Sequence, residues 1–208
     1  MQINPHFLYN TLDSIKWVAI LQKANNAAEM ITYLVRLLRI SLNKGREYVS
    51  IREEIEHVKC YVEIQKFRYN DKFDIEVEID ESLMQYRIPK LILQPIIENS
   101  IFHGFKQMRQ GGKINIKGWS QEKDILFSII DNGCGVEVNS VDRLLDSNLQ
   151  TNKGERLSGI GLNNVNERIK LIYGEKYGLK IENVDTGGTK VDVLLPRLNE
   201  ESGENVPC

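Results

Sequence analysis

Glu98, Asn99 and His103 interrupt a segment that is otherwise rich in isoleucine and leucine, PIIENSIFHGF at residues 95–105. In a helix, residues four apart lie on one face, so Asn99 and His103 would point the same way. A neutral amide oxygen is a reasonable Mg²⁺ ligand when phosphate groups supply the negative charge. The alternative is a core-edge asparagine that bonds to backbone groups. The segment therefore indicates either a phosphate-linked metal site or a structural amide.

Two glycine clusters follow farther along the chain. DNGCG at residues 131–135 directly ends an apolar strand pattern, and GIGL at residues 159–162 directly opens a helical pattern. Glycines there let backbone N–H groups approach an anion at the positive end of a helix. Asp-Asn-Gly after a strand is, by itself, most often only a turn. Together with Asn99, the two clusters favour a site for a phosphorylated ligand.

The chain opens with QINPHFLYNTLDSI at residues 2–15, where a histidine directly follows Asn-Pro. With Asn4 as the cap and Pro5 as the first helical residue, His6 falls in the first turn of a helix. His6 also falls opposite the apolar stripe of that helix and so points outward. The stripe consists of Leu8, Leu12, Ile15 and Ala19. An outward histidine is suited to accept a phosphoryl group, although in isolation Asn-Pro is simply a good helix start.

The composition restricts the class of protein. The 208 residues are 41% hydrophobic and carry a net charge of −2, which gives no sign of broad adhesion to nucleic acid or anionic lipid. The three cysteines are odd in number and lack a paired metal spacing, which favours a reducing compartment. The chain contains no run of about 18 apolar residues that could span a membrane. We therefore expect a cytoplasmic protein.

Hydrophobic periodicity predicts the elements that position these residues. Helical spacing before and after residues 23–26 predicts a helical hairpin, and Ser50 with Glu53 forms a capping box for a third helix that ends near Asn70. Further helices are predicted over residues 88–105 and 161–174. Strands are predicted over residues 73–80, 112–119, 125–131, 178–184 and 189–196. The fold class is α+β, with a helical region at 1–70, an α/β domain at 71–197 and a flexible tail at 198–208.

The order of the motifs resembles a known family. ENSIFHG, DNGCG, GIGLNNVNERI and GGTKVDVLLP follow one another as in the ATP-binding domain of the GHKL superfamily, which includes gyrase, Hsp90, MutL and the histidine kinases. The opening QINPHFLYNTLDSI narrows the resemblance to sensor histidine kinases of the LytS/YesM type, over residues 2–196. The resemblance implies a GHKL (Bergerat-type) α/β sandwich with a mixed sheet, preceded by a hairpin that dimerises and carries the phospho-acceptor.

The resemblance also implies roles for particular residues. Asp131 would accept the exocyclic amino group of adenine with support from Thr189, Asn99 would ligate Mg²⁺, and His103 would contact phosphate. His6 would be the phospho-acceptor. The remaining ATP-binding candidates are the glycine-cluster residues Gly133, Gly135, Gly159, Ile160, Gly161 and Leu162, which flank a polar lid at Val136–Ser158.

One position departs from the hydrolytic relatives. Gyrase-like ATPases carry a glutamate general base four residues before the metal asparagine, where this chain has Pro95. Proline cannot activate water, so its presence favours phosphoryl transfer to a protein group over ATP hydrolysis. Glu98, on a neighbouring part of the same helix, is a candidate to orient a reacting group.

The predicted function is therefore that of a cytoplasmic histidine kinase core. It would bind Mg·ATP, phosphorylate His6 in a homodimer and pass the phosphoryl group to an aspartate of a response regulator, without nucleic acid. Its only link to a membrane would be a sensor region that precedes this sequence. Two alternatives stay open: a GHKL serine kinase of the anti-sigma type, and a nucleotide-gated interaction module in which His6 is inert.

Overall fold

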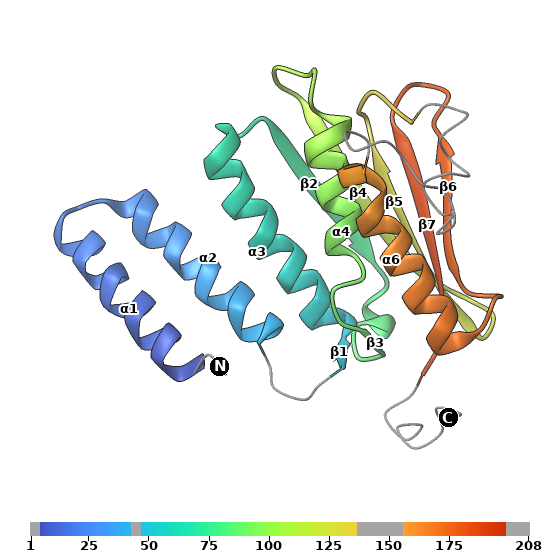
Figure 1. Ribbon diagram of the computed structural model, residues 1–208, viewed down its shortest axis with the longest axis horizontal. Helices are drawn as coiled ribbons and strands as arrows, with labels where there is room; N and C mark the ends of the chain where they lie inside the picture. The colour runs from blue at the N-terminus through green and yellow to red at the C-terminus, as the bar shows by residue number, and fades with distance from the viewer. Residues whose placement is uncertain (1–4, 43–46, 137–155, 199–208) are drawn as a thin grey trace.

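The computed structural model describes residues 5–42, 47–136 and 156–198. Figure 1 shows a helical hairpin at one end of the molecule and a sheet with helices along one of its faces at the other. No helix in the described parts of the chain is long and apolar enough to cross a membrane. The tail at 199–208 and most of the predicted lid, residues 137–155, lie outside the described residues.

The hairpin consists of α1 (Pro5–Leu21) and α2 (Asn25–Ser41). Helix α1 packs against α2, and α2 packs against α3 (Ile51–Tyr69). Ala19, at the end of the predicted apolar stripe, is buried. The helical N-terminal region is therefore confirmed.

Helix α3 begins at the predicted capping box. The Ser50 hydroxyl oxygen accepts a hydrogen bond from the Glu53 N–H at 3.1 Å, and the Ser50 N–H donates to Glu53 Oε2 at 2.8 Å. These two bonds satisfy backbone donors that a helix start leaves free. Helix α3 ends at Asn70, whose backbone is left-handed, so both predicted ends are confirmed.

The main sheet is mixed, as expected. Its order is β2 (Phe73–Ile79), β4 (Gly112–Gln121), β5 (Asp124–Asp131), β7 (Thr189–Pro196) and β6 (Gly178–Asn183). Strands β2 and β4 are parallel, and the other neighbours are antiparallel. Alternate side chains of each central strand point to the face that α3, α4 (Gln94–Asn99) and α6 (Arg156–Tyr173) cover. One hydrophobic core joins these helices to the sheet.

The helix predicted over residues 88–105 is wrong at its beginning. Strand β3 (Arg87–Pro89) pairs antiparallel with β1 (Tyr48–Ser50), and α4 begins only at Gln94. Between them Leu91 has a φ of 61°, a left-handed conformation that turns the chain. The apolar pattern does not reveal this break, because a short buried strand and a buried helix look alike in sequence.

The beginning of the last helix also differs from the prediction. Helix α6 begins at Arg156, so the glycine cluster at 159–162 lies within its first turns and does not open it. The first N–H groups of a helix lack partners inside it. In α6 these first N–H groups therefore belong to residues before Gly159.

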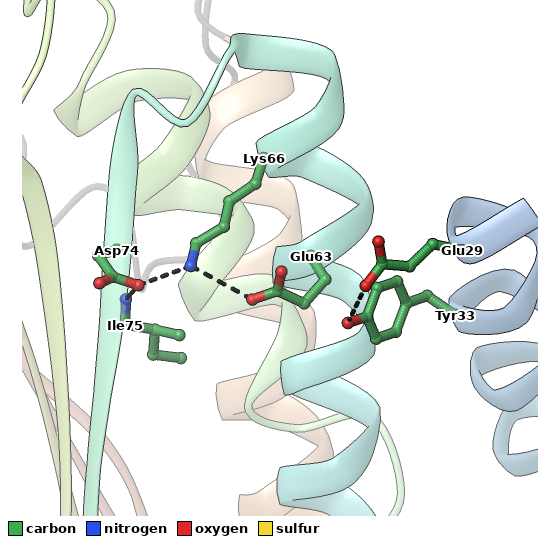
Figure 2. Close-up of polar contacts among 6 residues, drawn as sticks. All are labelled: Glu29, Tyr33, Glu63, Lys66, Asp74 and Ile75. Atoms are coloured by element: carbon green, nitrogen blue, oxygen red, sulfur yellow. Dashed lines mark hydrogen bonds and ion pairs between the residues drawn. The ribbon is translucent and has the colours of Figure 1, made fainter. Parts of the chain in front are cut away.

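Figure 2 shows how α3 is attached to the edge strand β2. The Lys66 ammonium lies 2.6 Å from Asp74 Oδ1 and 3.2 Å from Glu63 Oε1. Asp74 Oδ1 also accepts the Ile75 N–H at 2.9 Å, which directs the carboxylate along the strand. These contacts complement the apolar packing between α3 and the sheet.

A buried histidine joins α3 to the hairpin. His57 is fully buried, and its Nε2 lies 2.8 Å from the Ser41 hydroxyl oxygen at the end of α2. Burial lowers the pKa of His57 from 6.5 to about 4, so the ring is neutral at physiological pH. His57 therefore has a structural role between α2 and α3.

This histidine should make the fold sensitive to acid. Below pH 6.5 the unfolded chain binds a proton at His57 that the folded chain binds only near pH 4, so stability falls across this window. Between pH 7.5 and pH 5 the loss from this residue should be about 2 kcal/mol. Urea unfolding of the wild type and His57→Gln at both pH values measures it. An identical pH dependence in the two proteins would contradict the assignment.

Candidate functional site

The carboxylate of Asp131, at the end of β5, is buried with only 4% of the residue exposed. Its Oδ2 accepts the Ser100 hydroxyl at 2.7 Å. Its Oδ1 accepts the N–H groups of Gly133 at 2.8 Å and Thr189 at 3.2 Å. A carboxylate offers about four lone-pair positions. Within the described residues these three donors leave one acceptor position on the carboxylate.

The three donors come from different parts of the chain. Ser100 begins the π-helical segment η2 (Ser100–Gly104), Gly133 lies in the turn after β5, and Thr189 begins β7. The family resemblance paired Asp131 with Thr189, and the structure places that contact at the Thr189 backbone N–H. Ser100 was not predicted as a site residue, because nothing in the sequence distinguishes it from an ordinary helix residue beside Asn99.

Glycine is required where these segments cross. A Cβ atom on Gly133 would lie 2.6 Å from the backbone of Gly104, and one on Gly188 would lie 1.9 Å from the Asp131 carbonyl oxygen. The Cys134 N–H also donates to the Gly104 carbonyl at 3.0 Å. The turn after β5 thus lies directly on the end of η2.

The chain just after this turn is held by a residue that the sequence did not single out. Asn183 accepts the Val136 N–H at 2.8 Å and donates to the Val136 carbonyl at 2.6 Å. Gly135 lies beside it with a φ of 75°. Gly135, the second predicted glycine of this cluster, therefore supports this bend. Asn183 is the last residue of β6 and lies far from Val136 in the sequence, so the local sequence gave no signal for this contact.

Asn99 and His103 lie on either side of Ser100, one of the residues that contact Asp131. Asn99 is half-buried and immediately precedes Ser100, while His103 is exposed and immediately precedes Gly104. The segment between them is π-helical, with the Phe105 N–H bonded to the Ser100 carbonyl at 3.0 Å. Such segments occur frequently at functional sites.

The electrostatics around His103 favour a neutral ring. Burial and the nearby Lys106 ammonium both lower the pKa of His103. The ring can therefore donate one hydrogen bond and accept another near neutral pH.

The residues present fit a magnesium ion that arrives with phosphate. Within the described ranges, no group of three or more His, Cys, Asp or Glu side chains could hold a metal. Asn99 would thus be a single neutral ligand, and phosphate oxygens and water would fill the other positions, as Mg²⁺ prefers.

Gly161, in the second glycine cluster, lies beside the beginning of α4. A Cβ on Gly161 would lie 3.6 Å from Pro95 Cβ, so α6 packs against the beginning of α4. Leu162 is buried in the core. Gly159 and Ile160 are in the first turns of α6.

The carboxylate of Glu98 is already engaged. Its Oε1 accepts the Gln94 side-chain amide at 2.7 Å, within α4 itself. The Tyr61 hydroxyl of α3 lies near this carboxylate, and burial together with Glu98 raises the pKa of Tyr61. The structure therefore places Glu98 in a contact within its own helix, beside α3.

His6 is not brought to the site around Asp131. It lies exposed in the first turn of α1, with Asn10 Nδ2 3.3 Å from its Nδ1. Trp17, on the same predicted outward face, is 62% exposed. Figure 1 shows α1 at the end of the molecule opposite α6, with α2 and α3 between them.

Removing the Ser100 hydroxyl should weaken the structure around Asp131. Ser100→Ala should lower the free energy of unfolding by about 1.5 to 3 kcal/mol, because the hydroxyl donates to a buried carboxylate. Ser128 provides a matched control, since it lies on β5 with 2% exposed and its hydroxyl has no partner within the described residues. Ser128→Ala should change stability by less than about 0.5 kcal/mol. Equal losses in urea unfolding would contradict a special role for Ser100.

Two family models match the chain. Residues 1–73 match the model described as histidine kinase, and residues 86–199 match the model described as histidine kinase-, DNA gyrase B-, and HSP90-like ATPase. The second match covers more than half of the chain and includes every element around Asp131.

Individual proteins agree with these matches. Sensor histidine kinase YesM of Bacillus subtilis (strain 168) is 37% identical over 96% of this chain, and sensor histidine kinase BtsS of Escherichia coli (strain K12) is 31% identical over 96%. The chain spans 33% of the length of each of these curated relatives. The structure of Acinetobacter baumannii histidine kinase AdeS aligns with a TM-score of 0.51 at 14% identity, over 94% of this chain and 96% of that one, which supports the fold.

Proposed function

Because the chain belongs to the histidine kinase-, DNA gyrase B-, and HSP90-like ATPases, and among them to sensor histidine kinases of the LytS/YesM type, we propose that it binds Mg·ATP and phosphorylates His6. The observation that carries the nucleotide site is the Asp131 carboxylate, buried and with one acceptor position left.

The proposed adenine contact follows from the chemistry of Asp131. An ionised carboxylate can only accept hydrogen bonds, and the exocyclic amino group of adenine can donate one. Ser100, Gly133 and Thr189 hold the carboxylate in place, so it does not have to reorganise when the base binds. Burial also strengthens this hydrogen bond relative to one in water.

In the proposed complex the phosphate groups of ATP lie along α4 and η2. Asn99 would ligate Mg²⁺, and His103 would contact a phosphate oxygen. The metal would supply neutralisation of the charge that builds up on the transferred phosphoryl group. Pro95 offers no base to activate water, which favours transfer to a side chain over hydrolysis.

The acceptor is proposed to be His6. Its place in the first turn of α1 puts a phosphorylated ring near the positive end of the helix, which stabilises an anionic product. Because α2 and α3 lie between α1, which carries His6, and α6 (Figure 1), transfer requires either movement of the hairpin or a histidine from a second copy.

The surface of α1 supports pairing with a second copy. Its exposed apolar residues include Phe7, Val18 and Leu21, which lie on a stripe spaced 4, 3, 4 and 3 with Thr11 and Ser14. We propose that this stripe packs against its equivalent in a homodimer. An aspartate of a response regulator would then receive the phosphoryl group, and the chain would form the cytoplasmic part of a longer membrane sensor.

Labelling with γ-³²P ATP tests the proposal. The protein should acquire acid-labile, alkali-stable label, as expected for a phosphorylated imidazole, and His6→Gln should abolish it. The chain contains only three histidines, and His57→Gln serves as the control because His57 is a buried structural residue. It should retain the label at pH 8.

Other outcomes would identify the two remaining candidate functions. Acid-stable label would indicate a serine or threonine kinase. ATP binding without any label, at protein concentrations where the dimer is populated, would indicate a nucleotide-gated interaction module and would overturn the kinase proposal.

A further inference from the structure

Helix α3 contains a fully buried carboxylate, Glu54, that none of the contacts around Asp131 uses. Its Oε2 accepts the Leu91 N–H at 2.9 Å, and its Oε1 accepts the N–H groups of Ile92 at 2.9 Å and Leu93 at 3.0 Å. A buried charge is costly unless it is hydrogen-bonded or paired. Three consecutive backbone donors provide this compensation here.

These three N–H groups lead directly into α4. Leu93 is the N-cap of α4 and makes no side-chain cap hydrogen bond, and Pro95 has no N–H. Glu54 therefore binds the backbone that leads into α4, up to its N-cap residue, and not the N2 or N3 groups that a local serine or aspartate cap would bind. A helix of this length is not stable alone, so its position depends on such anchors. The bond to Leu91 also holds its left-handed backbone.

Tyr61 of α3 lies near the other end of α4. Burial and the nearby carboxylate of Glu98, the residue just before Asn99, raise the pKa of the Tyr61 hydroxyl. Glu54 and Tyr61 are seven residues apart, which puts them two turns apart on one side of α3. Helix α3 therefore holds the chain at the beginning of α4 and also lies close to the residue before the proposed metal ligand.

Helix α6 also contacts the chain that Glu54 binds before α4. Arg168 donates from Nη1 to the Lys90 carbonyl at 2.7 Å, and its positive charge acts on Glu54. Burial raises the pKa of Glu54, while the backbone N–H groups and Arg168 oppose that rise. The chain just before α4 is thus held at two points. Glu54 of α3 accepts its N–H groups, and Arg168 of α6 donates to its Lys90 carbonyl.

We propose that Glu54 is a positioning residue for Mg·ATP, which fixes the beginning of α4 so that Asn99 meets the metal. It acts through α4 and does not contact the nucleotide. This inference rests on the proposed function, because it assumes that Asn99 ligates Mg²⁺.

Glu54→Gln tests the inference. Glutamine keeps the size of the side chain, but its NH₂ group would face a backbone N–H, so one or more of the three bonds is lost. The Kd for Mg·ATP should rise about tenfold or more, as the loss of hydrogen bonds to a charged group predicts. The Kd for ATP in EDTA should rise less than about twofold, because the Asp131 contact stays. Titration calorimetry measures both constants.

Two further variants make the result specific. Glu53→Gln alters the neighbouring residue, which bonds only to Ser50 at the capping box in the contacts described for it, and should leave both constants unchanged. Asn99→Ala should show the same selective loss as Glu54→Gln. Without a selective loss in Asn99→Ala, the metal assignment in the proposed function fails.

Other results would contradict the role of Glu54 alone. A selective loss in Asn99→Ala with none in Glu54→Gln, or an equal loss of both constants in Glu54→Gln, would overturn it. If Glu54→Gln does not fold, Tyr61→Phe replaces it, since this variant removes only the Tyr61 hydroxyl that lies near Glu98. Tyr61→Phe should show a smaller loss selective for Mg·ATP, and unchanged binding would overturn the inference.

Discussion

A carboxylate removed from water needs hydrogen-bond donors, and at Asp131 this need determines how the surrounding segments meet. The donors are the Ser100 hydroxyl, the Gly133 N–H and the Thr189 N–H, from three elements that are distant in the sequence. Glycines let the backbone come close enough for these bonds, most tightly at Gly133 beside Gly104. The requirement of one buried charge thus fixes the end of β5, the π-helical segment and the beginning of β7 around a single acceptor.

Helix α3 connects this arrangement to the hairpin. Toward α2 it presents His57, bonded to Ser41, and toward α4 it presents Glu54 and Tyr61. Helix α3 thus joins the hairpin to the chain that leads into α4, beside the proposed nucleotide site.

Local patterns predicted much of the fold because period-two and helical spacing are local properties. The capping box at Ser50 and Glu53 and the five strands of the main sheet followed from such patterns. The pairing of Asp131 with Thr189 came from the family resemblance instead. The errors concern contacts between distant residues. The β1–β3 pairing places Ile88 and Pro89 in a strand and not at the start of the predicted helix, and the Glu54 contact with Leu91–Leu93 holds the chain where α4 begins. Nothing within a few residues of either site reveals these partners.

The central claim is that Asp131 recognises the amino group of adenine. Inosine triphosphate carries a carbonyl at C6 where ATP carries that amino group, so the pair isolates this contact. Calorimetry with both nucleotides should show that the wild type prefers ATP by about tenfold or more, and that Asp131→Asn loses this preference because its amide can donate to the inosine carbonyl. The same preference for ATP in both proteins would contradict the claim.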